Sequence, residues 1–280
     1  MVKNSSSSNN NLIVKNTAFL YFRMLFSMGI TLYTSRLILT ILGIDDFGIY
    51  NVIGGMVSMF LFLNTAMSSA TSRFLTFEIG KREKSEISKV FSVSLTTHLI
   101  IIAIIFVLCE SIGVWFLNSK MIIPEDRVYA ANIVLQTSIA ASLINIIQVP
   151  YRAIVVSYEK MDMYAYIEIF NVVSKLLIAI ALIYTTYDKL ITYSYLYLVT
   201  CVVVFLIYAV YANFRCVGAN FSPKLDKDIL KPMLTFTGWD FYGNASVVAR
   251  TQGVNMLLNI YFGPVLNAAN GIATQVQGAA

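Results

Sequence analysis

The sequence predicts an all-α membrane protein that crosses the bilayer several times, and its composition is the first reason. The chain of 280 residues is 58% hydrophobic and only 12% charged, whereas a soluble globular domain carries about 25% charged residues. Apolar runs of about 20 residues, the length that spans a bilayer, recur along the whole chain. Runs such as LIIIAIIFVL (99–108) are continuous, whereas the strands of a membrane β-barrel alternate apolar and polar residues. The spans are therefore expected to be helices.

The apolar runs define the order of the elements. Residues 1–11, MVKNSSSSNNN, are polar and low in complexity and lack the pattern of a cleavable signal peptide, so we expect a disordered tail there. Seven spans follow, joined by short connections. They are expected at residues 17–41, 48–72, 90–117, 128–150, 163–187, 190–214 and 233–262, with an eighth beginning near Pro264. The chain stops at Ala280, a few turns into this eighth span, so we expect it to be part of a longer protein.

Lysine and arginine predict the orientation, because cytoplasmic loops of membrane proteins are enriched in both. Only Lys120, Arg127 and Lys189 lie in loops opposite the N-terminus. Thirteen lie on the N-terminal side: Lys3, Lys15, Arg73, Lys81, Arg82, Lys84, Lys89, Arg152, Lys160, Arg215, Lys224, Lys227 and Lys231. We therefore expect a cytoplasmic N-terminus. The net charge of +5 reflects this topology, and the chain lacks the soluble basic module that a nucleic-acid partner would require. The charged segment 73–91 is expected to be an amphipathic helix at the inner leaflet or a solvated basic loop.

Several ionisable residues fall inside the predicted spans, where each costs about 2.5–3.5 kcal/mol at the bilayer centre. Arg23 and Arg36 each lie about five residues from an end of the first span, so each either extends its head group to the interface or faces a cavity. Lys175 and Arg250 lie deeper in their spans, so extension of the head group to the interface explains their positions less well. The remaining ionisable residues of the spans are His98, Glu110, Glu168 and Asp240.

Polar residues also follow helical periodicities. Tyr164, Glu168, Asn171 and Lys175 are spaced i, i+4, i+7 and i+11, which places them on one face of the fifth span. Glu168 and Lys175 lie about 10 Å apart along the axis, too far for an ion pair, so each needs another partner. Further stripes consist of Asn51, Ser58, Thr65 and Ser72 on the second span, and of Thr137, Ala141, Asn145 and Gln148 on the fourth. Such stripes either pack helices together or line a hydrated cavity. Because several spans carry a polar face, the sequence favours the cavity.

The sign of the charges predicts what such a cavity would accept. The deep cations Arg23, Arg36, Lys175 and Arg250 outnumber the deep acids Glu168 and Asp240. A cavity of net positive charge suits an anionic substrate such as an isoprenoid diphosphate headgroup, because arginine can donate two parallel hydrogen bonds to a phosphate. The seventh span also carries Gly238, Gly243 and Gly253, which are typical either of a bending, gate-like helix or of a closely packed one.

We expect no enzyme activity, catalytic residue, cofactor or metal site. Cys109, Cys201 and Cys216 are far apart and show no CxxC spacing. The predicted outer loops are too short to build the acceptor site of a glycan polymerase or glycosyltransferase, which would need paired carboxylates. Asp45 and Asp46 are adjacent residues of a predicted turn, where aspartate commonly solvates and initiates the turn.

Three stretches resemble one family of transporters: SRLILTILGIDDFGIYNVIGG (35–55), VPYRAIVVSYEKMDMYAY (149–166) and RTQGVNMLLNIYFGPVLNAANGIATQV (250–276). They are similar to segments of the bacterial polysaccharide flippases, the O-antigen or Wzx-type members of the multidrug/oligosaccharidyl-lipid/polysaccharide exporter superfamily. The resemblance reaches from about residue 12 to the end of the chain. It departs from the family at Asn270, where an arginine is expected.

The resemblance implies a transporter of roughly 12–14 helices, with two pseudo-symmetric lobes around a central cavity. Residues 12–231 would form the first lobe, and residues 232–280 would begin the second. The implied function is the translocation of an undecaprenyl-diphosphate-linked oligosaccharide across the bacterial inner membrane by alternating access, for surface polysaccharides such as lipopolysaccharide. A polysaccharide polymerase and a chain-length regulator are the implied partners, beside the lipid bilayer.

Residue roles follow from combining the resemblance with the residue pattern. Arg23, Arg36, Lys175 and Arg250 are the candidates for binding the diphosphate. Glu168, Asn171, Asp240, Asn145 and Gln148 are candidates for lining the cavity or for coupling. The alternative function is a cation-coupled exporter of small molecules from the same superfamily, which would use Glu168 and Asp240 as ion sites.

Overall fold

The computed structural model describes residues 3–60, 62–81, 84–119, 123–221, 226–240, 242–243 and 246. The eighth predicted span, most of the seventh and Arg250 lie outside these residues. The α-helices labelled in the described part are α1 (Lys3–Phe60), α2 (Phe62–Lys81), α3 (Lys84–Leu108), the short α4 (Val114–Ser119), α5 (Val128–Ser157), α6 (Met161–Ala181) and α7 (Lys189–Arg215). A π-helical turn (Cys109–Gly113) joins α3 to α4, and 3₁₀ turns occupy Glu125–Arg127 and Leu182–Tyr184. Residues 227–240 are also helical.

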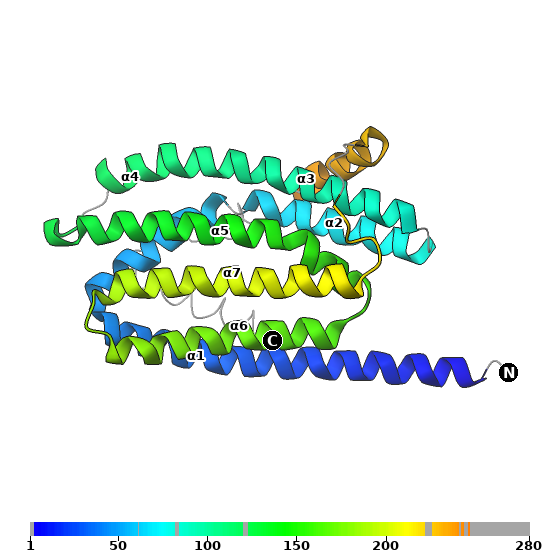
Figure 1. The fold of residues 1–280 in the computed structure, drawn as a ribbon, viewed down its shortest axis with the longest axis horizontal. Coiled ribbons are helices and arrows are strands. Elements are labelled where there is room, and N and C mark those ends of the chain that lie inside the picture. The colour runs from blue at the N-terminus through cyan, green and yellow to red at the C-terminus, as the bar shows by residue number, and fades with distance from the viewer. Residues whose placement is uncertain are drawn as a thin grey trace.

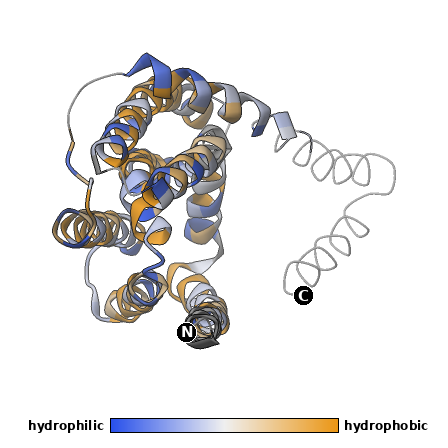
Figure 2. Ribbon diagram, turned by 90° about the vertical axis from the view of Figure 1, so that its right-hand side faces the viewer, coloured by the Kyte–Doolittle hydropathy of each residue, from blue (hydrophilic) through white to orange (hydrophobic). Residues whose placement is uncertain are grey.

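The helices form an up-and-down bundle (Figure 1). The N-terminus and the α2–α3 connection lie at one end, and the α4–α5 and α6–α7 connections lie at the other (Figure 1). Five described segments are long and apolar enough to cross a membrane: Thr17–Gly43, Ser85–Ser119, Glu125–Ser157, Met161–Tyr184 and Lys189–Arg215. Seen end-on, most helices carry hydrophobic residues around much of their circumference (Figure 2). The prediction of an all-α, multi-pass membrane protein is confirmed.

The turn between the first two predicted spans consists of one residue. α1 continues from the first span into the second, and its helical geometry is broken only at Gly43, whose φ of 81° and ψ of 174° are not helical. Glycine reaches this backbone conformation easily because it has no Cβ. The predicted spans 17–41 and 48–72 are thus consecutive helices that meet at Gly43, and the range of the second includes the end of α1 and the start of α2.

Three local predictions need correction. Residues 3–11 belong to α1, where the sequence predicted a disordered tail; extending an existing helix needs no new nucleus, so even a serine- and asparagine-rich stretch can continue it. The charged segment 73–91 forms no separate amphipathic helix, because its described residues belong to the end of α2 and the start of α3. α5 continues past Pro150 to Ser157, although proline removes one backbone hydrogen bond.

The core is centred on α5, which packs against α1, α2, α3, α6 and α7. Half of the most apolar stretch of α5 is buried, a larger share than in the other four candidate spans. One apolar cluster near the N-terminal end of the bundle contains Phe91 and Tyr208, and a second cluster toward the other end contains Ile53 and Leu135. α6 lies beside α1 and α7 and also contacts α5, so side chains on its polar face can find partners on these helices.

Candidate functional site

The polar face of α6 carries one tyrosine of its own and contacts two tyrosines of α7. Together these residues form a polar seam between the helices of the lobe. We call it the tyrosine seam. Its members are Tyr164, Glu168 and Lys175 on α6, and Tyr197 and Tyr208 on α7. All but Tyr208 are partly buried, and Tyr208 is fully buried. The predicted shared face of Tyr164, Glu168 and Lys175 therefore lies at helix contacts.

Glu168 and Lys175 have separate partners, as their spacing predicted. The Tyr208 hydroxyl donates a hydrogen bond to Glu168 Oε1 over 3.3 Å. Lys175 Nζ lies 5.3 Å from the centroid of the Tyr197 ring, within the range of a cation–π interaction. Neither side chain forms a salt bridge with another described residue. The Lys175 charge is therefore faced by an aromatic ring instead of being neutralised by a carboxylate of the described residues.

The aromatic surroundings of Lys175 extend onto α1. The rings of Tyr193 and Tyr197, one turn apart on α7, are stacked with centroids 6.5 Å apart. Tyr50, in the second helical part of α1, meets Tyr193 edge-on with centroids 4.9 Å apart. Asn145 of α5 approaches the same region, with its Nδ2 3.9 Å from Cys201 Sγ. Lys175 thus lies beside a group of aromatic rings that α1 and α7 contribute, with one amide of α5 nearby.

Arg23 joins α1 to the other end of the seam. Its Nη1 donates a hydrogen bond to the Tyr164 hydroxyl over 2.9 Å, and its guanidinium carbon lies 4.9 Å from the centroid of the same ring. The buried Nε atom of Arg23 has no hydrogen-bond partner among the described residues. Arg23 therefore lies at the α1–α6 contact with unused donor capacity.

Arg36 does not share the surroundings of Lys175, although the sequence allowed both to line one cavity. Arg36 is exposed, whereas Thr34 and Ile38 on the opposite face of α1 are about 5% exposed. This burial pattern turns Arg36 away from the interior of the described lobe. Asp240 is partly buried near the end of the helix at 227–240, and Arg250 lies outside the described residues.

The remaining polar candidates are spread over the interior. Asn171 is partly buried on α6, and Gln148 is 8% exposed on α5, with an Oε1 atom that no described group hydrogen-bonds. His98 is fully buried, and its Nδ1 lies 2.7 Å from the Ser94 carbonyl of its own helix. Glu110 accepts a hydrogen bond from Gln136 of α5 over 3.2 Å. These residues do not form one site with the tyrosine seam.

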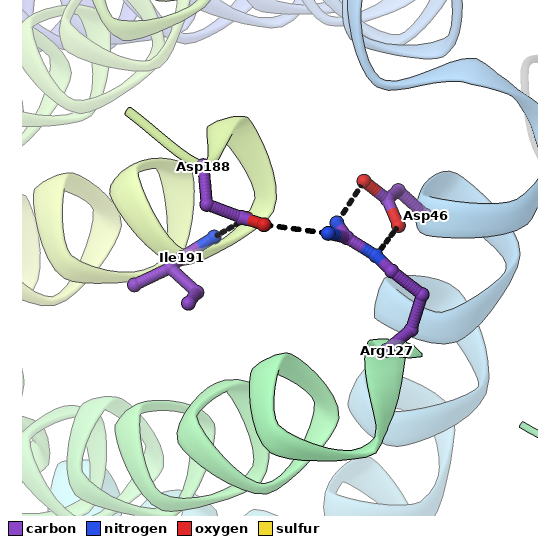
Figure 3. A network of polar contacts seen from close by, with 4 residues as sticks. All are labelled: Asp46, Arg127, Asp188 and Ile191. Atoms are coloured by element: carbon purple, nitrogen blue, oxygen red, sulfur yellow. Dashed lines mark hydrogen bonds and ion pairs between the residues drawn. The ribbon is translucent and has the colours of Figure 1, made fainter. Parts of the chain in front are cut away.

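A second polar cluster, which the sequence did not predict, lies where α5 and α7 begin (Figure 3). Arg127, immediately before α5, donates from Nε and Nη2 to the two carboxylate oxygens of Asp46, the first over 2.8 Å. Its Nη1 donates to Asp188 Oδ2 over 2.5 Å. We call these three residues the Arg127 cluster. Asp46 is thus the partner of a charged pair, and its role as a merely solvated turn residue is corrected.

The Arg127 cluster connects three elements. Asp46 follows the Gly43 break of α1, Arg127 begins α5, and Asp188 caps α7 by accepting a hydrogen bond from the Ile191 N–H over 3.0 Å (Figure 3). Burial alone would raise the pKa of the Asp188 carboxyl, but the Ile191 N–H and the Arg127 guanidinium together lower it below its usual value of 3.8. The signal in the sequence was the placement of all three residues in connections on the same predicted side.

Comparisons with known proteins identify the fold. No protein-family model and no curated protein matches the sequence. Among solved structures, a MATE transporter in a straight conformation superposes with a TM-score of 0.78 at 17% identity, over 95% of this chain and 60% of that one. An outward-facing multidrug resistance MATE transporter of the MOP superfamily gives 0.77 at 17% identity, with the same coverage. A MOP superfamily transporter from Pyrococcus furiosus, described as having a binding pocket of reversed polarity, gives 0.76 at 17% identity, over 94% and 60%.

The chain matches only part of each of these transporters. The chain spans about 60% of the length of the transporters it matches, and it corresponds to their N-terminal part. The proteins that share the fold are transporters and not enzymes. The chain is a multi-pass helical membrane protein with the fold of the N-terminal lobe of MATE-like transporters of the MOP superfamily.

Proposed function

We propose that the protein translocates an anionic lipid-linked substrate, specifically an undecaprenyl-diphosphate-linked oligosaccharide, across the bacterial inner membrane by alternating access. The observation that carries the proposal is the position of Lys175. This lysine lies in the middle of a membrane-spanning helix, partly buried, with a tyrosine ring as its neighbour and no salt bridge to a described residue. Cations held inside a membrane protein commonly mark the path of a substrate or ion.

The charge balance of the seam supports an anion over a cation as the cargo. Arg23 and Lys175 bring two positive charges to the α6 region, while Glu168 brings one negative charge that Tyr208 already hydrogen-bonds. The oxygens of a diphosphate can accept hydrogen bonds from Arg23 and Lys175, because both side chains are donors without acceptor atoms. The similar transporter from Pyrococcus furiosus is itself described as having a binding pocket of reversed polarity that suggests a different function, and it provides a precedent for variation of the pocket within this fold.

The sequence resemblance to polysaccharide flippases adds the identity of the carrier lipid. It favours surface polysaccharide synthesis, such as that of lipopolysaccharide, as the process that uses the flipped product. In this proposal Arg36 and Arg250 contribute from outside the seam, and a polymerase and a chain-length regulator receive the product. The N-terminus is proposed to be cytoplasmic because lysine and arginine are enriched on its side of the bundle.

The proposal is tested by neutralising Lys175 in cells that depend on the protein for surface polysaccharide. Lys175→Met keeps an unbranched apolar stem but removes the charge, and Lys175→Arg keeps the charge. Lys189→Met, at the exposed start of α7, is the matched control. We expect Lys175→Met to reduce surface polysaccharide, Lys175→Arg to retain most of it and Lys189→Met to retain all of it, at equal membrane abundance. Full polysaccharide levels in Lys175→Met would contradict the proposal.

A cation-coupled exporter of small molecules is the second candidate, and one observation favours it. Glu168 provides a carboxylate inside the membrane-spanning region, held by the Tyr208 hydroxyl, and one of the compared structures is a multidrug resistance MATE transporter. This function predicts that Glu168→Gln abolishes proton- or sodium-driven dye efflux, while Lys175→Met leaves efflux unchanged. The reverse dependence supports the flippase.

A further inference from the structure

An apolar groove runs along the outer surface of α7, away from both polar clusters. Its volume is about 490 Å³, which lies within the usual range of small-molecule sites, about 300–1,000 Å³. It is lined by one residue of α6 and seven of α7: Met163, Val203, Leu206, Ile207, Val210, Tyr211, Phe214 and Arg215. All but Tyr211 and Arg215 are wholly apolar, so the groove favours a hydrocarbon chain.

The groove lies on an exposed face of α7. Leu206, Val210 and Phe214 are four residues apart, so they stand above one another on one face of α7. Their exposed fractions are 50%, 53% and 82%. Because α7 is long and apolar enough to cross the membrane, large apolar side chains exposed on its surface are expected to contact lipid chains.

The length of the groove matches a single leaflet. From Val203 to Arg215 α7 rises about 18 Å, at 1.5 Å per residue, which is slightly more than half of a hydrocarbon core about 30 Å thick. The groove therefore begins near the middle of α7 and ends at its last residue. Such a groove accommodates one acyl chain whose head group lies beside Arg215.

The charges at the open end suit an anionic head group. Arg215 lines this end, and Lys160 lies close enough to the adjacent Cys216 to interact with it electrostatically. The Tyr211 hydroxyl, a hydrogen-bond donor, lies within electrostatic range of both Arg215 and Asp162. Arg215 is the charged residue that lines the groove, so it places a positive charge at this end of an otherwise largely apolar surface.

We propose that this groove is a binding site for one anionic phospholipid of the leaflet nearest the C-terminal end of α7. One acyl chain lies along Leu206, Val210 and Phe214, and the phosphate interacts with Arg215 and Lys160. The site is separate from the tyrosine seam, and the bound lipid is a resident molecule instead of the cargo. The inference holds for either of the transport functions considered above.

The experiment measures lipid retention by the purified protein. The protein is placed in nanodiscs of phosphatidylcholine containing a small fraction of spin-labelled phosphatidylglycerol or, in parallel, spin-labelled phosphatidylcholine. The motionally restricted fraction of each lipid is read by electron paramagnetic resonance. Two variants test the two halves of the site: Arg215→Gln removes the charge, and Val210→Trp fills the groove. Lys189→Gln, at the other end of α7, and Val199→Trp, at an exposed position outside the groove, are the matched controls.

The expected results separate the head group from the chain. Arg215→Gln should weaken the preference for phosphatidylglycerol by about fivefold, the effect of one basic residue near an anionic lipid. Val210→Trp should reduce the restricted fraction of both lipids, and the controls should behave as the wild type. Equal restriction of the two lipids by the wild type would overturn the proposal, as would an unchanged preference in Arg215→Gln. If Val210→Trp instead separated a dimer without altering lipid restriction, the groove would be an interface between two copies. The readout involves no translocation, so it does not depend on the transport proposal.

Discussion

Arg127 binds both carboxylate oxygens of Asp46, and this pair joins the turn after the first helix of the lobe to the start of α5. The third guanidinium nitrogen holds Asp188, the N-cap of α7. A planar guanidinium can satisfy two carboxylates at once in this way, whereas a lysine could not reproduce the same paired geometry. One arginine thus connects three helices that are far apart in the sequence.

Replacing Arg127 is expected to destabilise the protein more than replacing either carboxylate. Arg127→Met leaves Asp46 and Asp188 partly buried without their partner, whereas Asp46→Asn still leaves Arg127 bound to Asp188. We expect losses of about 1–3 kcal/mol for Arg127→Met and less for Asp46→Asn, since charged hydrogen bonds contribute about 1.5–3 kcal/mol and solvent still screens these partly buried groups to some extent. Thermal unfolding in detergent measures both variants. Lys189→Met, at the same end of the bundle, should change little, and equal melting temperatures for all variants would contradict the prediction.

The stability provided by Asp188 should depend on pH in one direction. Its pKa is lower in the folded protein than its usual value of 3.8, so the carboxylate stabilises the fold fully above that value and loses its effect as the pH falls through the lower folded value. The difference in melting temperature between the wild type and Asp188→Asn is therefore expected to be constant from pH 8 to about pH 5 and to shrink below about pH 4. A difference that grew on acidification would show that the sign is wrong.

Gly43→Ala is expected to cost about 1–3 kcal/mol, because a φ of 81° with a ψ of 174° lies in a region that glycine occupies almost alone. An added Cβ would meet no atom within 4 Å, so the cost comes from the backbone and not from a clash. Gly48→Ala is the matched control, because it too has open space but lies in regular helix. The control should be neutral or slightly stabilising. If both variants unfolded at the same temperature, the strained geometry at Gly43 would be refuted.

Gly218→Ala should destabilise the connection that follows α7, for two reasons. Its φ is 90°, and an added Cβ would lie 2.6 Å from Ile87 Cγ2 on α3. Shortening the neighbour in the double variant Gly218→Ala/Ile87→Ala removes the closest contact, but Ile87 Cβ would still lie 3.0 Å from the added Cβ, and the backbone strain also remains. We therefore expect the combined loss of stability to be smaller than the sum of the two single losses, as measured in a double-mutant cycle. Strict additivity would mean that the two residues do not touch.

The sequence predicted the spans well because their signal is local. Continuous apolar runs identified the helices around 90–117, 128–150, 163–187 and 190–214, and the structure places helices in each of these ranges. The boundaries were less accurate. α5 passes through Pro150, since the cost of one lost hydrogen bond is small against the packing of a helix at the centre of the bundle.

The candidate site was predictable only in part. Helical spacing placed Glu168 and Lys175 on one face and required a separate partner for each, which the structure supplies as Tyr208 and Tyr197. The identity of those partners depends on how α6 packs against α7, which no local pattern encodes. For the same reason the sequence treated Asp46 and Arg127 as unrelated residues of two loops, although they are 81 positions apart and in direct contact.

The Gly43 break also determines how the first two helices can move. A single non-helical residue separates them, so no flexible loop lies between the two helices. Motion of one helix relative to the other would therefore involve rotation about the backbone bonds of Gly43. The first helix reaches from Lys3 to the break and is therefore about 60 Å long, so a rotation of about 10° there displaces its far end by roughly 10 Å. The Arg127 cluster anchors the second helix three residues beyond the pivot. Any rotation of the first helix about Gly43 would therefore move its N-terminal end most and leave its end beside the Arg127 cluster nearly in place.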